Sequence, residues 1–204
     1  MTDRSPTTAL KARKLPGQSR SAATVAAIVE AAARILETEG FEGYTTNAIA
    51  ARAGVSIGSL YQYFPNRDAI TRALIERQGE ALLADALAIG NEVHGRAAME
   101  RLLAVAVTHQ LCRPVLARLL DLEENRLPVG EDLRGIGDRA AVILRQCLVD
   151  AELGGAPNDP AIGDIMAIVR GMVDAAGQRG ETDETLLLAR VKCAVFGYLE
   201  QRRN

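Results

Sequence analysis

Apolar residues recur along most of the chain at the three- and four-residue spacing that places them on one face of an α-helix. The clearest stretch begins at Ser21 and is stopped by Gly40. Its apolar face consists of Val25, Ile28, Val29, Ala32, Ile35 and Leu36. We find no stretch with the alternation that is typical of a β-strand. The pattern therefore predicts an all-α protein.

Two short helices are predicted next from residues that begin and end helices. Thr45 or Thr46 can cap a helix that reaches about Ala53, because a threonine oxygen accepts a hydrogen bond from the first backbone amides. Ser56 can cap another helix that reaches Phe64, where the proline that follows disfavours continuation. A glycine-containing turn joins the two helices.

A long fourth helix is expected from about Arg67 to Ala88. Asn66 can cap it, and Asp68 lies in its first turn, where a negative charge is favourable. The periodicity then breaks at Gly90, Asn91 and Gly95. Further helices are expected at about residues 97–111, 114–125, 133–152, 160–178 and 182–201. We find no internal repeat and no phosphate-binding glycine loop.

Composition narrows the class of protein. Among 204 residues, 48% are hydrophobic and 25% charged, and no apolar run approaches the ~20 residues that cross a bilayer. No apolar signal core follows the first charges, so a cytoplasmic location without membrane contact is expected. The three cysteines lack metal-binding spacing and lie in apolar helical stretches, which favours small buried side chains over reactive thiols or a metal site.

Charge is unevenly distributed. The net charge of −2 argues against indiscriminate binding of nucleic acid. Residues 1–20, in contrast, contain Arg4, Lys11, Arg13, Lys14 and Arg20 against the single Asp3. We interpret this segment as a flexible basic arm that adds phosphate or minor-groove contacts. The alternative is a solvated tail with no partner.

The stretch from residue 45 to 70 has the spacing of a helix-turn-helix. Ala50 provides a small residue where two helices cross, Gly54 can adopt a positive φ in the turn, and Leu60 is an apolar anchor. Ile49, Ala53, Val55 and Tyr63 occupy the supporting apolar positions. An isolated helix of under ~12 residues is marginal in water, so packing must hold the short second helix. For Tyr63 and Phe64 we favour core packing over stacking on nucleic acid.

The outward side of that short helix suits a DNA groove. With Leu60 and Phe64 turned inward, the residues left toward solvent are Ile57, Gly58, Ser59, Tyr61 and Gln62. They offer backbone amides, hydroxyls and a side-chain amide, the groups that a major groove accommodates.

Residues 25–75 resemble the DNA-binding domain of the tetracycline-repressor (TetR) family of bacterial transcription regulators. The stretch "AAARILETEGFEGYTTNAIAARAGVSIGSLYQYFPNRDAI" has the family's Gly-Phe, paired threonines, Ile-Ala, Ala-Gly-Val-Ser and Gly-x-Leu-Tyr-x-Tyr-Phe in order. The resemblance covers about a quarter of the chain. It implies a helix-turn-helix domain at 21–66 and a larger helical ligand-binding and dimerisation domain at 67–204.

The resemblance also implies roles for matching residues. Thr46 and Tyr61 would contact phosphates, and Arg67 would reach the DNA backbone. The residues at or beside the bases would be Asn47, Ile57, Gly58, Ser59 and Gln62, next to the capping Ser56. Because Ile57 has no side-chain hydrogen-bonding atom, Gln62 and Asn47 are the expected hydrogen-bonding readers of base edges.

One short recognition helix contacts few base pairs, so we expect a homodimer whose two helices lie about 34–36 Å apart. Small residues recur at four-residue spacing in the last two helices, which lets backbones approach closely. These small candidate interface residues are Gly163, Ala167, Gly171 and Ala175, followed by Ala189, Cys193 and Gly197. Phe196 is expected to add apolar area beside them. The alternative is that both helices only cover the core of their own chain.

The helices between residues 67 and 152 are expected to surround a pocket. His109 shares a helix face with Leu102 and Val105, and Arg113 follows one turn later. Together they can orient the polar or anionic end of a mostly apolar small molecule. The alternative for His109 is a core residue with its hydrogen bonds satisfied.

We therefore expect a ligand-responsive, sequence-specific transcriptional regulator, a repressor that a small molecule releases from double-stranded operator DNA. Two other classes remain. An enzyme would need a nucleophile motif, a cofactor loop or a spaced metal-ligand pair, and we find none, so no catalytic residue or cofactor is expected. An all-helical protein-interaction adaptor would explain the apolar stripes but not the hydroxyl and amide groups beside the glycine turn.

Overall fold

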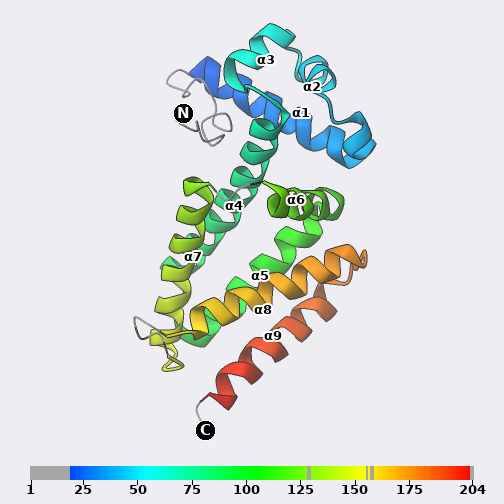
Figure 1. The fold of residues 1–204 in the computed structure, drawn as a ribbon. Helices are drawn as coiled ribbons and strands as arrows, with labels where there is room; N and C mark the ends of the chain where they lie inside the picture. Colours follow the sequence, from blue (N-terminus) through cyan, green and yellow to red (C-terminus); the bar gives the residue numbers. More distant parts are fainter. Residues whose placement is uncertain (1–18, 128–129, 155, 157–158, 203–204) are drawn as a thin grey trace, which may run out of the picture. The chain divides into compact units, whose positions relative to one another are not determined.

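The computed structural model describes residues 19–127, 130–154, 156 and 159–202. Within these residues the chain forms helices joined by short loops and contains no strand (Figure 1). The predicted all-α class is confirmed. Most of the basic arm expected at residues 1–20 lies outside the described residues.

The helices form two compact units. The first unit comprises residues Met1–Gln78 and Leu119–Gly130, and the second comprises Gly79–Arg118 and Glu131–Asn204. Two helices, α4 (Arg67–Glu92) and α6 (Pro114–Arg126), contribute residues to both units. The division expected after residue 66 concerned function rather than contacts, and it stays a prediction.

The first unit is built on α1 (Ser19–Gly43). Its predicted apolar face is buried from Ile28 to Leu36, and Val25 is half-buried. At Gly40 the backbone leaves the helical region (φ 63°, ψ −158°), and one further turn carries the element to Gly43. The predicted stop at Gly40 is therefore a kink rather than the last residue.

Local capping determines the next elements as the sequence predicts. In α2 (Thr46–Ala53), the Thr45 side chain accepts a hydrogen bond from the Ala48 amide. Gly54 ends this helix with φ 69°, a conformation that costs other residues strain. In α3 (Ile57–Tyr63), the Ser56 side chain accepts from the Ser59 amide.

The fourth helix is longer than predicted. Asn66 Oδ1 accepts a hydrogen bond from the Ala69 amide at 2.8 Å, as expected, but α4 continues past Ala88 to Glu92. A glycine costs a helix about 1 kcal/mol, which tertiary packing can offset. Such packing is present at Gly90, where an added Cβ would lie 3.8 Å from Ile143 Cγ2.

The second unit surrounds α5 (Gly95–Cys112), which packs against α7 (Glu131–Asp150), α8 (Ala161–Gln178) and α9 (Glu184–Gln201). Fully buried members of its core include Ala98, Met99, Val107, Leu148, Leu187, Val191 and Val195. Cys147 is buried, and burial raises the pKa of its thiol. Cys112 and Cys193 are exposed, so the prediction of three buried cysteines is wrong for these two. Both lie on a helix side turned away from the core.

No helix in the described ranges combines the length and the apolar character needed to cross a membrane.

Candidate nucleic-acid interface

Only one side of the short helix α3 is packed against the rest of the first unit. Leu60 and Phe64 are 0% and 1% exposed, and they pack into the core of the first unit with Ile49 and Ala50 of α2. Tyr63 is half-buried. Phe64 therefore packs in the core as expected, and it helps to hold a seven-residue helix that would not be stable alone.

The opposite side of α3 faces solvent. Ile57 and Tyr61 are 38% and 41% exposed. Gly58 and Gln62 are also exposed, while Ser59 is half-buried. All five residues expected on the outward side of this helix are thus at least partly accessible.

Hydroxyl groups join α2 to α3 at this surface. Thr46 Oγ1 and Tyr61 Oη, both expected to contact phosphates, lie 3.1 Å apart and share a hydrogen bond. Two hydroxyls held this close can both reach one phosphate. Ser56 Oγ is occupied differently, since it accepts from the Ser59 amide at 3.0 Å and lies 2.9 Å from Ser59 Oγ. Ser56 therefore acts first as a helix cap, although it remains exposed.

Asn47 and Arg67 flank this surface, and both are exposed. The Arg67 guanidinium carbon lies 5.8 Å from the centroid of the Tyr44 ring, close enough for a cation–π interaction. Arg67 therefore begins α4 beside an aromatic ring that can restrict its orientation.

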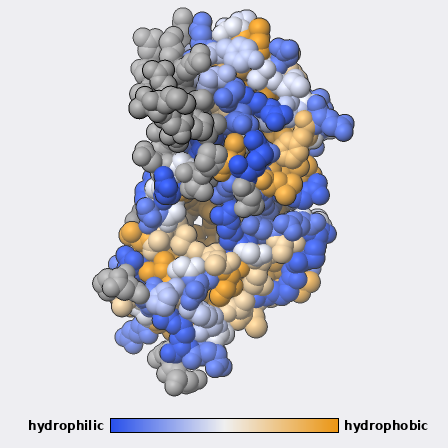
Figure 2. Space-filling model, in the orientation of Figure 1, coloured by the Kyte–Doolittle hydropathy of each residue, from blue (hydrophilic) through white to orange (hydrophobic). Residues whose placement is uncertain are grey.

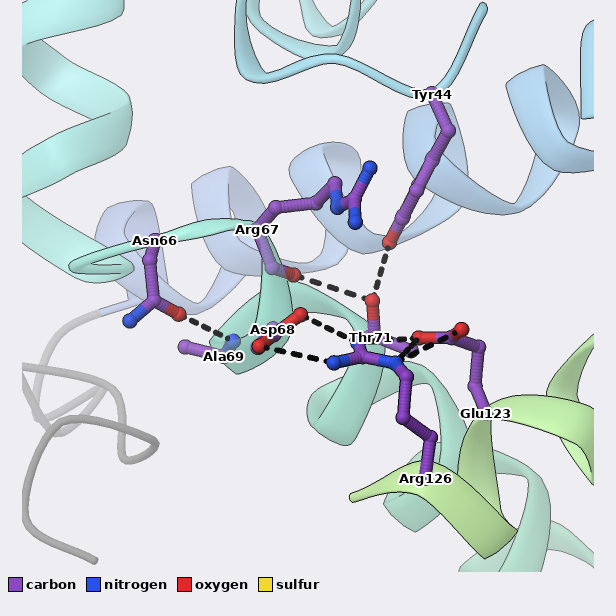
Figure 3. A network of polar contacts seen from close by, with 8 residues as sticks. All are labelled: Tyr44, Asn66, Arg67, Asp68, Ala69, Thr71, Glu123 and Arg126. Atoms are coloured by element: carbon purple, nitrogen blue, oxygen red, sulfur yellow. Dashed lines mark hydrogen bonds and ion pairs between the residues drawn. The ribbon is translucent and has the colours of Figure 1, made fainter. Parts of the chain in front are cut away.

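A buried polar pair lies beneath Arg67 (Figure 3). Tyr44 Oη and Thr71 Oγ1 are 3.1 Å apart, and the two residues are 1% and 0% exposed. Thr71 Oγ1 donates to the Arg67 carbonyl oxygen at 3.1 Å, so the proton between the two hydroxyls comes from Tyr44. Burial raises the pKa of Tyr44 to about 12. The pair connects the loop before α2 to the first turn of α4.

An ionic network lies next to this pair and joins α4 to the end of α6. Arg126 Nη2 lies 2.6 Å from Asp68 Oδ1 and also 2.6 Å from Glu123 Oε2. The hydrogen bonds with Glu123 and then Asp68 raise the pKa of Arg126. This network is not predictable from the sequence, because only the three-residue spacing of Glu123 and Arg126 is local.

The four expected ligand-binding residues lie on α5 and directly after it. A surface hollow of about 270 Å³ lies between α4 and α5. It is lined by Ala88, Ile89, Glu92, Arg101, Ala104 and Val105. Of the four expected residues, only Val105 lines it. His109 Nε2 instead lies 2.8 Å from Asp85 Oδ2, and Leu102 and Arg113 are half-buried elsewhere on α5 and at its end.

The small-residue stripes of α8 and α9 face outward. Gly163, Ala167, Gly171, Ala189 and Cys193 are exposed, and Ala175 and Gly197 are half-buried. Phe196 is different: it is 6% exposed, and the Arg96 guanidinium carbon lies 3.9 Å from its ring centroid. The structure places Phe196 in the core of its own chain, because helix α9 turns this residue toward α5.

The fold and this surface together define a helix-turn-helix protein of the all-α, DNA-binding class. Comparison with known proteins gives the family. The family model described as bacterial regulatory proteins of the tetR family matches residues 28–74. The chain belongs to this TetR family, as the motif predicted.

Similarity to curated relatives extends beyond the DNA-binding part. The chain is 31% identical over 147 residues to the nucleoid occlusion factor SlmA of Vibrio cholerae, covering 69% of this chain and 74% of the relative. It is 32% identical over 132 residues to SlmA of a Marinomonas species, covering 62% of this chain and 66% of that relative. The solved structure of the fatty acid degradation regulator FadR from Bacillus halodurans has the same fold. Its TM-score is 0.69 at 18% identity, covering 84% of this chain and 97% of that chain.

Proposed function

We propose that the protein is a homodimeric transcriptional repressor that binds a specific operator and leaves it when a small molecule binds. The observation that carries the DNA-binding part is the two-sided construction of α3. Its inner side is completely buried at Leu60, and its outer side exposes Ile57 and Tyr61. A helix that is held from behind and accessible in front suits insertion into a major groove.

In this proposal the exposed residues divide into two groups by chemistry. Thr46, Tyr61 and Arg67 bind phosphates and fix the position of the protein on the duplex. Asn47 and Gln62 bind base edges, since their side-chain amides can donate and accept at once. Ile57 contacts thymine methyl groups, and the backbone beside it lies close to the bases.

The dimer would form through the outer faces of α8 and α9. An added Cβ at Gly163, Gly171 or Gly197 would meet no atom of the chain within 4 Å, so a second copy can approach these backbones closely. Met166 and Leu186 add apolar area, with 36% and 55% of their surface exposed. Hydrophobic residues (orange) lie among hydrophilic ones (blue) on the visible face in Figure 2.

The small molecule would bind in the second unit, between α4 and α5, with its anionic end at His109. There it would replace the Asp85 carboxylate, which lies 2.8 Å from His109 Nε2. Since α4 contributes residues to both units, its displacement would carry the signal to the DNA-binding unit. A coupling of about 1–3 kcal/mol is typical of such regulation.

A second candidate is a DNA-binding factor whose binding no small molecule controls. The observation that favours it is the size of the α4–α5 hollow, about 270 Å³. Ligand pockets usually measure roughly 300–1,000 Å³. The related SlmA proteins are named nucleoid occlusion factors.

Mapping of the bound chromosomal sites in cells, by crosslinking and sequencing, separates the two candidates. A repressor of the proposed kind occupies a few promoters, and its occupancy falls when its ligand is supplied. A factor like the second candidate keeps the same occupancy whatever small molecule is supplied. Absence of any enriched site would contradict both.

Sequence-specific binding itself is tested by gel-shift titration at two salt concentrations. We expect affinity for a selected duplex to fall steeply with salt while remaining well above affinity for a scrambled duplex. Equal affinity for the two duplexes at both salt concentrations would contradict the proposal.

A further inference from the structure

The last turn of α6 holds the first turn of α4 within the first unit. The Arg126 guanidinium binds both oxygens of Asp68, with Nη2–Oδ1 at 2.6 Å and Nη1–Oδ2 at 3.4 Å. Its Nε lies 3.1 Å from both carboxylate oxygens of Glu123, one turn earlier on α6. Figure 3 shows the guanidinium between the two carboxylates. Arg126 therefore uses its whole planar fork, which a lysine cannot reproduce.

The first turn of α4 is also the segment that presents Arg67 to solvent. Arg67 directly precedes Asp68, and its carbonyl oxygen accepts the hydrogen bond from Thr71. Asn66 caps the same turn at the Ala69 amide. Any rotation or fraying of this turn must therefore change the direction in which the Arg67 side chain leaves the helix.

The side chains of this network are too exposed for its main role to be stabilisation of the fold. The side chains of Arg126 and Asp68 are 45% and 34% exposed. Ion pairs with this exposure contribute little to stability. A small energy is nevertheless enough to select one orientation of an exposed helix end.

We infer that Arg126 is a positioning residue for DNA binding, which acts by holding Asp68 and thereby the first turn of α4 in the orientation that directs Arg67 at a phosphate. The inference rests on the proposed function. It assigns to a residue of α6 a role in DNA binding that acts through α4. Like α4, α6 contributes residues to both units.

The test uses the full-length protein and a duplex that the wild type selects from a random library. We expect Arg126→Gln to weaken binding to this duplex by about three- to fivefold, as loss of one well-formed ion-pair network allows. The melting temperature should change little. Arg118→Gln is the matched control, because it removes the same charge from an exposed position of the same helix and should leave affinity unchanged.

Arg126→Lys separates orientation from charge. If the planar fork positions α4, the lysine variant loses affinity as the glutamine variant does. Wild-type affinity in Arg126→Lys would overturn the inference, because charge alone would then be sufficient. This variant keeps the charge and most of the length of the side chain, so a folding defect is not expected from it.

A double-mutant cycle with Asp68→Asn completes the experiment. In the Asp68→Asn background, Arg126→Gln should have no further effect on affinity, since its partner is already absent. Equal losses in both backgrounds would overturn the inference, as would a loss that follows the melting temperature. If the wild type selects no duplex at all, the proposed function fails first, and that failure is distinguishable because no variant is needed to see it.

Discussion

Removal of the Tyr44 hydroxyl should lower stability, whereas removal of the Tyr61 hydroxyl should weaken DNA binding. Tyr44 is 1% exposed and donates to Thr71, whereas Tyr61 is 41% exposed and shares its hydrogen bond with Thr46 at the surface. Tyr→Phe makes the same chemical change at both positions. The pair therefore separates stability from DNA binding in one experiment.

For Tyr44→Phe the structure gives the magnitude. The Thr71 hydroxyl still donates to the Arg67 carbonyl, so no buried donor loses its partner. The cost is then that of one neutral hydrogen bond, about 1 kcal/mol. In a protein of this size, that lowers the melting temperature by about 2–4 °C.

For Tyr61→Phe, water replaces the lost surface hydrogen bond, so stability should change by less than about 0.5 kcal/mol. Operator affinity should fall by about fivefold on every duplex, since a phosphate contact carries no sequence information. Circular dichroism during thermal unfolding and gel-shift titration measure the two effects. If Tyr61→Phe lowers the melting temperature as much as Tyr44→Phe, or if Tyr44→Phe leaves it unchanged, the assignment of buried and exposed roles is wrong.

The pH supplies a second readout for Tyr44. Burial raises its pKa from 10.0 to about 12 in the folded protein. A pKa raised by folding means that the stabilisation is complete below pH 10 and is lost as pH rises toward 12. The stability advantage of the wild type over Tyr44→Phe should therefore shrink between pH 8 and pH ~11 in urea titrations. An advantage that does not change with pH would contradict a buried, neutral phenol.

Five further variants, one of them a control, test other parts of the structure. Gln62→Ala should change which bases are preferred in duplex selection, while Arg67→Gln should weaken all duplexes alike and reduce the salt slope by about one. If the base preference of Gln62→Ala is the same as that of the wild type, Gln62 does not contact base edges. Gly54→Ala should cost about 1 kcal/mol of unfolding free energy, because φ is 69° with open space around it. Gly135→Ala, near the start of α7, should not be destabilising. If both variants lose the same unfolding free energy, the strain argument is wrong. Gly171→Glu should yield monomers in analytical ultracentrifugation, and a stable dimer of this variant would place the interface elsewhere.

Features that depend on neighbouring residues were accessible from the sequence. Thr45, Ser56 and Asn66 cap their helices as predicted, because a side-chain oxygen and an amide two or three residues later suffice for a cap. The helix-turn-helix followed from Gly54 and Leu60 for the same reason. Each of these signals lies within one or two helical turns.

Features that depend on distant residues were not accessible. Gly90 was expected to end α4, but packing near Ile143 of α7 carries the helix past it. Arg126 and Asp68 are 58 positions apart, so only the fold shows that they meet. Phe196 was expected to add apolar area to an interface, although Arg96 of another helix covers its ring. In each case tertiary contacts outweigh the local pattern.

The central claim is that the outer side of α3 enters duplex DNA twice in each dimer. A hydroxyl-radical footprint on the selected duplex tests it most directly. We predict two protected patches related by two-fold symmetry, with centres about one helical turn or a whole multiple of it apart, and both patches should need about fivefold more protein in Tyr61→Phe. A single patch, or protection that is the same on selected and scrambled duplexes, would contradict the account.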